Sequence, residues 1–151
     1  MKLWDKGIDT NQLIEDFTVG KDKNLDLLLA EFDVIGTMAH ITMLEDTGLL
    51  AKHELRILLS ELKRIYNDIK AGHFSINKGV EDVHSQVELM LTQKTGDLGK
   101  KVHSGRSRND QILLDIRLFV RNEIANLVHS TKELFDLLIA QSEKYSDVLL
   151  P

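Results

Sequence analysis

The sequence predicts an all-α fold, and three observations support that prediction. The chain's single proline is Pro151, its last residue, so no earlier position lacks the backbone donor that an α-helix needs. Apolar residues recur at three- and four-residue steps, which is the spacing of one face of a helix. One such stretch continues from residue 107 almost to the end of the sequence, well beyond the length of an ordinary helix.

Two helices are predicted in the first half of the chain. In 25–46 and in 52–71, leucine, isoleucine and other apolar side chains form one stripe each. Glycines follow both stripes, at Gly48 and Gly72. Glycine commonly ends a helix because it adopts the left-handed conformation that a C-terminal cap requires. We therefore expect both helices to end just before these glycines.

Two further helices are predicted in the second half. A weaker one starts at Asn77 or Gly79 and ends at Gly96. The last one starts near Ser107 and runs to about Tyr145, which at 1.5 Å per residue is a rod of ~55 Å. Apolar residues cover one broad side of this rod, and Leu114 and Leu118 lie roughly opposite (Ile112, Ile116, Phe119, Val120, Ile124, Leu127, Val128, Leu134, Phe135 and Leu138). Such a helix needs partners on more than one side, supplied by other copies or by further chain.

Composition and charge exclude several classes of protein. The 151 residues have the length of one ordinary domain, and a net charge of -5 argues against general nucleic-acid binding. The sequence has no cysteine, which excludes disulfides and thiolate metal sites and fits a reducing compartment. Residues 1–24 are polar and predicted to be irregular, and Asp5 interrupts any signal-peptide pattern. No apolar run is expected to reach the ~20 residues of a membrane span, so we expect a soluble cytoplasmic protein with no membrane partner.

The most informative segment is 99–111, which precedes the long helix. It carries Arg106, Ser107, Arg108 and Asn109 directly before or at the helix start, where unpaired backbone N–H groups and the helix dipole favour negative charge. A well-capped helix start explains Ser107 and Asp110, which resemble a capping box. It does not explain the two arginines, whose positive charges are unfavourable there without an anion. The segment therefore predicts a site for an anionic small molecule.

A second candidate motif is Glu81-Asp82-Val83-His84, which places two carboxylates beside an imidazole. As a metal site it is poor, because no second histidine follows at a ligand spacing. His84 could bind a substrate or act in proton transfer, but a lone histidine near a helix start is more often a surface or capping residue. From the residues alone both interpretations stay open, and no metal or other cofactor is predicted.

The run His103-Ser104-Gly105-Arg106-Ser107-Arg108-Asn109-Asp110-Gln111 resembles the first signature region of argininosuccinate lyases, in the fumarase/aspartase superfamily. Further similarity covers the whole chain, in the blocks Leu3-Trp4, Phe17-Thr18, 33–40 and 81–84. The resemblance implies a small N-terminal helical domain, 1–106, followed by the first long helix of a central helical bundle, 107–151. It further implies that such long helices build the core of a homotetramer.

The resemblance also implies a reaction and a set of site residues. Members of the family are carbon–nitrogen lyases of arginine biosynthesis that split argininosuccinate into arginine and fumarate, reversibly and without a cofactor. By position, Ser107, Arg108 and Asn109 would bind substrate, and Asp82 and His84 would line the same site. No catalytic residue falls in this chain, because the catalytic base belongs to a later signature region that the sequence does not contain.

Departures from the family pattern shape the remaining expectations. Asp5 follows Trp4 where the family has glycine, and Gly20 stands where a substrate-binding serine is usual. Two later signature regions are absent, so the chain is interpreted as the N-terminal third of an argininosuccinate lyase that is inactive alone. The alternative is a non-catalytic helical module, derived from the lyases, that uses its long apolar helix only for assembly.

Overall fold

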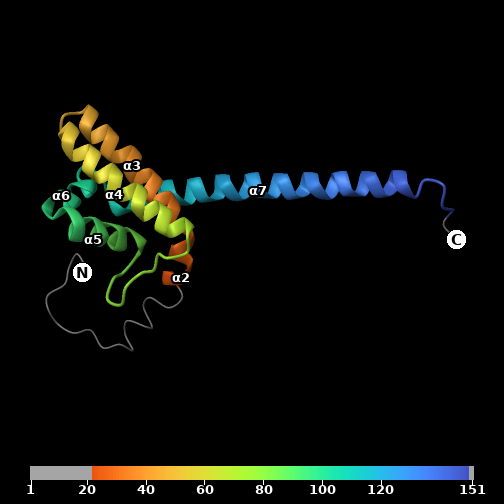
Figure 1. Cartoon of the computed structure of the whole chain (residues 1–151), viewed down its shortest axis with the longest axis horizontal. Helices are drawn as coiled ribbons and strands as arrows, with labels where there is room; N and C mark the ends of the chain where they lie inside the picture. The colour runs from red at the N-terminus through yellow and green to blue at the C-terminus, as the bar shows by residue number, and fades with distance from the viewer. Residues whose placement is uncertain (1–21, 150–151) are drawn as a thin grey trace. The chain divides into compact units, whose positions relative to one another are not determined.

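The computed structural model describes residues 22–149, which contain helices and no strand. The predicted all-α class is confirmed for this part of the chain (Figure 1). Two compact units can be distinguished, one extending to Ile116 and the other starting at Arg117. The domain boundary predicted between 106 and 107 stays a prediction. The blocks Leu3-Trp4 and Phe17-Thr18, and the position of Gly20, lie outside the described residues.

The first predicted helix corresponds to a continuous helical stretch with a tight turn inside it. This stretch comprises α2 (Asp22–Asp26), the 3-10 turn η1 (Leu27–Leu29) and α3 (Ala30–Asp46). Residues 22–24 are thus helical, although the sequence predicted them to be irregular. After α3 the chain turns at Gly48, whose φ of 78° is unfavourable for any residue with a Cβ atom.

The second predicted helix is confirmed almost residue for residue as α4 (Lys52–Lys70). The Glu54 carboxylate accepts a hydrogen bond from the backbone N–H of Ala51 at 2.9 Å, which satisfies one free donor at the helix start. The helix ends before Gly72, which has a φ of 73°. The glycine signal therefore marked both helix ends correctly.

The third predicted helix starts later than expected. Helix α5 spans Val83–Thr95, because the Asp82 side chain caps it by accepting the N–H of Ser85 at 2.8 Å. The backbone N–H of Asn77, one predicted start, instead donates to the Gln86 side chain at 3.0 Å. Two short elements after Gly96 were not predicted: α6 (Asp97–Lys100) and the 3-10 turn η2 (Lys101–His103). Elements of three or four residues are too short to show a periodic pattern.

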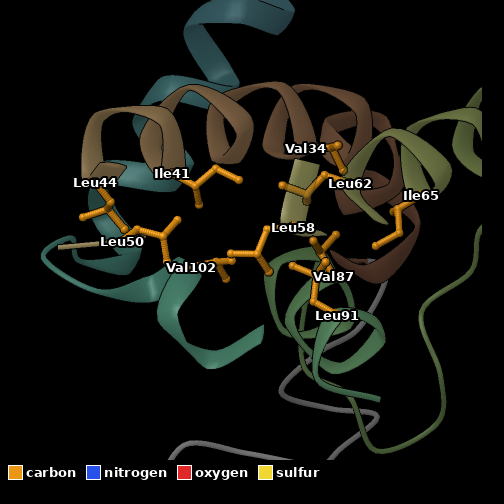
Figure 2. Packing of buried hydrophobic residues seen from close by; sticks show 10 residues of the cluster. All are labelled: Val34, Ile41, Leu44, Leu50, Leu58, Leu62, Ile65, Val87, Leu91 and Val102. Carbon is orange, nitrogen blue, oxygen red and sulfur yellow. The ribbon is translucent and has the colours of Figure 1, made fainter. Parts of the chain in front are cut away.

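The core of the first unit lies between α3, α4 and α5. Figure 2 shows its buried side chains converging from these helices, with further contributions from the turn after α3 and from η2. The set is Val34, Ile41, Leu44, Leu50, Leu58, Leu62, Ile65, Val87, Leu91 and Val102. Gly99 lets α6 approach α5 closely, since an added Cβ would lie 2.6 Å from the Thr92 backbone nitrogen. The stripe predicted in 52–71 is therefore a core face. The stripe predicted in 25–46 is wrong in large part: its members Leu25, Leu28, Ile35 and Met43 are exposed, and α3 instead buries Val34 and Ile41.

One helical stretch, Lys23–Asp46, is long and apolar enough to cross a membrane, judged by length and composition alone. The expectation that no stretch would reach that length is wrong for this segment. A core helix has the same composition, and α3 buries polar residues such as Asp33 and Thr37 in contact with other parts of the first unit. The length and composition of the stretch are therefore weak evidence for a membrane span.

The final predicted helix is confirmed as α7 (Arg108–Lys144), a single helix of 37 residues. Its residues up to Ile116 belong to the first unit and the remainder to the second. In the second unit, large apolar side chains are more than half exposed along the helix (Ile124, Leu127, Val128, Leu134, Phe135, Leu137 and Leu138). A long row of exposed apolar side chains is typical of an interface rather than of a free surface.

Candidate anion-binding site

The start of α7 is a capping box, as the sequence predicted. The Ser107 backbone N–H donates to the Asp110 carboxylate at 2.7 Å, and the Asp110 N–H donates to the Ser107 hydroxyl at 3.4 Å. These bonds, the backbone bond first, lower the pKa of Asp110 below its ordinary value. The side chains of Ser107 and Asn109 are exposed. Two of the predicted ligand-binding residues are thus held at the surface by a defined helix start.

Arg108 joins this helix start to the start of α5. Its Nη2 donates to the Ser85 hydroxyl at 3.1 Å, and its Nε lies 3.4 Å from the Asp82 carboxylate. The Arg108 and Asp82 side chains keep 24% and 21% of their surface exposed, so the pair is within reach of a ligand. Two predicted site residues that lie far apart in the sequence are therefore brought together. The carboxylate of Asp82 also supplies part of the negative charge that the sequence pattern required beside Arg108.

His84 occupies a different position from the other predicted residues. Its ring is buried, with Nδ1 at 2.8 Å from Asp33 Oδ1 and 3.7 Å from Asp115 Oδ2. Burial alone would lower the pKa of His84, but the hydrogen bond and charge of Asp33, with Asp82 and Asp115, raise it above its ordinary value. The role of His84 in lining the site with Ser107, Arg108 and Asn109 stays a prediction.

Arg106 turns inward rather than toward solvent. Its Nη2 donates to the Thr37 hydroxyl at 2.9 Å, and the charges of Asp33 and Asp115 act on its guanidinium. Burial lowers its pKa, and the two carboxylates oppose that effect. The anions that stabilise Arg106 are therefore protein groups, whereas the sequence pattern had suggested a ligand.

Sequence reasoning missed Asp33, Asp115 and Gln111 as parts of this region. The Gln111 side-chain amide donates to Asp33 Oδ1 at 3.3 Å, across 78 residues of sequence. The one available signal was Asp115, an acidic residue three positions after Ile112 and four before Phe119, on the predicted apolar side of the long helix. In the structure both acids are 1% exposed. Charged residues at core positions are rare unless they are paired, so an acidic residue at such a position indicates a partner nearby.

The buried groups of opposite charge form one cluster. The donor atoms of Asp33, His84 and Asp115 lie within 4.8 Å of one another, a spacing that a metal ion could bridge. The guanidinium of Arg106 and, when protonated, the ring of His84 lie near the same carboxylates and offset part of their negative charge. A cavity of about 10 Å³ beside Asp33, His84 and Arg106 has room for one water molecule.

The cluster predicts a specific dependence of stability on pH. Burial and the charge of Asp33 raise the pKa of Asp115 to about 7, although His84 and Arg106 oppose that shift. The folded chain therefore holds this proton more tightly than the unfolded chain, whose aspartates titrate near pH 3.9. The stability that Asp115 contributes is complete below that pH and is lost as the pH rises to about 7. The raised pKa of His84 acts in the same direction at higher pH.

The unfolding free energy of the wild-type chain should fall as the pH rises from about 5 to about 8, and we expect it to fall less in Asp115→Asn. Urea titrations of the wild-type and variant chains at both pH values measure that difference. Asp136→Asn, which removes an exposed carboxylate from α7, should keep the wild-type pH dependence. If Asp115→Asn and Asp136→Asn behave alike, the assigned proton on Asp115 is wrong.

Comparisons with known proteins match almost the whole chain. A family model described as "Lyase" matches residues 6–151. The argininosuccinate lyases of Parabacteroides distasonis and Bacteroides thetaiotaomicron are each 59% identical over 150 residues, which cover 99% of this chain and 34% of each of those proteins. The argininosuccinate lyase of Trichlorobacter lovleyi is 40% identical over 152 residues, or 99% of this chain and 33% of that protein.

The chain thus spans about a third of the length of the curated relatives that it matches. The family match includes all the residues that the capping box, Arg108 and the buried cluster contribute. It also includes every helix that the structure describes. The chain therefore belongs to the lyase family whose model it matches.

Proposed function

We propose that this chain is part of an argininosuccinate lyase, a carbon–nitrogen lyase that releases arginine and fumarate from argininosuccinate. The observation that carries the proposal is the contact between Arg108 and Asp82, which brings the two family-like sequence blocks together beside the start of α7. The names of the relatives at 59% identity support the same activity. The cytoplasmic location expected from the sequence is part of this proposal.

The chemistry suits the donors that this chain provides. In the proposed elimination, a base removes a proton from the carbon beside a carboxylate of the succinyl group. The electron pair then forms the C=C bond of fumarate, and the C–N bond breaks as the guanidino nitrogen leaves with arginine. Negative charge accumulates on the carboxylate oxygens before the bond breaks, and fixed donors stabilise such charge most when they are already oriented.

Within this chain, the proposed binding group consists of Ser107, Arg108 and Asn109 at the start of α7. The helix dipole and the guanidinium act in the same direction on a carboxylate. Asp82 is proposed to orient Arg108. His84 is proposed to line the same site from its buried side. The base is assigned to no residue of this chain, so the chain alone is expected not to turn over argininosuccinate.

The exposed apolar side of α7 supports a proposal for the partner. We propose that copies of the complete protein pack their α7 helices together, as the resemblance to tetrameric lyases implies. Leu127, Val128 and Phe135 are each more than 60% exposed, and their burial would contribute about 25 cal/mol per Å² of apolar area. A helix with this pattern gains its stability mainly from packing.

A chimera tests both proposals. In it, residues 1–151 replace the corresponding third of the Parabacteroides distasonis argininosuccinate lyase. We expect the chimera to convert argininosuccinate to fumarate, followed by ultraviolet absorbance, and to sediment as a tetramer, while the 151-residue chain alone is inactive. A tetrameric chimera without activity would contradict the proposed lyase function and favour the non-catalytic assembly module. An active chimera that sediments as a monomer would contradict the proposed role of α7.

A further inference from the structure

We propose that one face of α3, formed by Asp33, Gly36, Thr37 and His40, is a positioning surface that holds the donor segment 104–111 in place. We call it the α3 positioning face. The inference rests on the proposed function, because it assigns to these residues the task of orienting the substrate-binding donors. The sequence and the resemblance placed no site residue on this helix.

The contacts along the face follow a simple order. His40 donates its Nε2–H to the Ser104 carbonyl at 2.8 Å, and the Thr37 hydroxyl accepts from Arg106 at 2.9 Å. One turn earlier, Asp33 accepts from Gln111 at 3.3 Å. Successive turns of α3 therefore hold successive parts of the segment 104–111, and the segment runs antiparallel to the helix. Positions 33, 37 and 40 lie on one helix face because a turn takes 3.6 residues.

A close approach of the two helices reinforces these bonds. A Cβ added to Gly36 would lie 2.8 Å from Leu114 Cδ2 and 3.6 Å from Asp115 Oδ1. Glycine at this position therefore lets the first turns of α7 contact α3 directly. The polar contacts on either side of Gly36 then fix the segment at three points rather than one.

The α3 positioning face also offsets the repulsion between two arginines of the donor segment. Arg106 and Arg108 lie two residues apart at a helix start, and the charge of Arg108 acts unfavourably on Arg106. The carboxylates of Asp33 and Asp115, both buried, act favourably on Arg106 from the core side. One arginine is thus neutralised internally by the fold, and the partly exposed Arg108 is left to face a ligand.

Burial separates this role from catalysis. Asp33 and Thr37 are each 1% exposed, so neither side chain can touch a substrate at the surface. Their effect can only pass through the residues that they hold. A displacement of about 1 Å in substrate-binding groups can reduce a rate about a hundredfold, so the accuracy of this support matters.

The test uses Thr37 variants of the chimera. Thr37→Val removes the acceptor for Arg106 at nearly constant volume, and we expect KM for argininosuccinate to rise about tenfold while the protein stays folded. Loss of folded protein alone would lower kcat and leave KM unchanged. Thr37→Ser keeps the hydroxyl and should restore the wild-type KM. The matched control is Thr42→Val, since Thr42 is exposed on the same helix and its hydroxyl donates to the Met38 carbonyl within it.

A second readout does not depend on activity. In the 151-residue chain, Thr37→Val should speed hydrogen exchange of the backbone amides in 104–111 and leave α4 unchanged, as measured by mass spectrometry. An inactive parent chimera would refute the proposed function, whereas this exchange experiment would still decide the positioning role. Wild-type KM and wild-type exchange in folded Thr37→Val would overturn the inference. If Thr37→Val does not fold, Thr37→Ala takes its place, and failure of both to fold would assign Thr37 to the core and overturn it as well.

Discussion

Arg108→Ala is expected to lower kcat/KM of the active chimera by about a hundredfold or more, the effect of removing one oriented donor from developing negative charge. Arg108 is the proposed donor with the most complete orientation, because Ser85 and Asp82 hold its guanidinium from the α5 side. Arg108→Lys should recover only part of the activity, since lysine cannot form two parallel hydrogen bonds with a carboxylate. Fumarate release at a series of argininosuccinate concentrations measures the effect.

The matched control for this change is Arg56→Ala, which removes an exposed arginine from α4. It should leave kcat/KM unchanged. Neither substitution should alter the unfolding free energy by more than about 1 kcal/mol, because partly exposed ion pairs contribute little. Wild-type kinetics in Arg108→Ala would remove this residue from the proposed site.

Leu58→Ala is expected to reduce the unfolding free energy by about 2–5 kcal/mol, the usual range when a buried leucine is truncated. Leu58 is 0% exposed and lies in the cluster where α3, α4 and α5 meet (Figure 2). The loss combines the transfer energy of the removed methyl groups with the cavity that they leave. Urea denaturation followed by circular dichroism measures it.

Leu127→Ala is the matched control, because the same side chain is 67% exposed on α7. Its effect on the unfolding free energy of the 151-residue chain should stay within about 0.5 kcal/mol. Equal effects of the two substitutions would show that the core assigned to the first unit is wrong.

The sequence was sufficient for the three longest helices because their signals are local. Periodic apolar residues and the glycines at 48 and 72 placed the end of α3 and both ends of α4 to within about one residue. The same holds for α7, whose capping residues Ser107 and Asp110 lie three positions apart. The start of α5 was predicted too early, at Asn77 or Gly79. The helix starts after Asp82 because the side chain of that residue caps it.

The candidate site could be predicted from the sequence only in part, for the opposite reason. Its decisive contacts are long-range: His84 meets Asp33 across 51 residues, and Arg106 meets Thr37 across 69. A single sequence shows that two arginines at a helix start need negative charge nearby, but it does not say whether a ligand or the protein supplies it. For Arg106 the protein supplies that charge, and for Arg108 Asp82 supplies part of it.

The two oxygens of Asp82 have a consequence for how easily a ligand could take over Arg108. Oδ1 caps α5 through the N–H of Ser85, while Oδ2 faces the guanidinium. An incoming carboxylate competes with Oδ2 and with the Ser85 hydroxyl, but not with Oδ1, so α5 keeps its cap when Arg108 changes partner. The exchange breaks one partly solvated ion pair, a loss of about 0.2–1 kcal/mol, and one hydrogen bond to the Ser85 hydroxyl. Arg108 thus rests against a weakly bound carboxylate of the protein itself. A dicarboxylate ligand that binds the guanidinium more strongly can replace that carboxylate without unwinding α5.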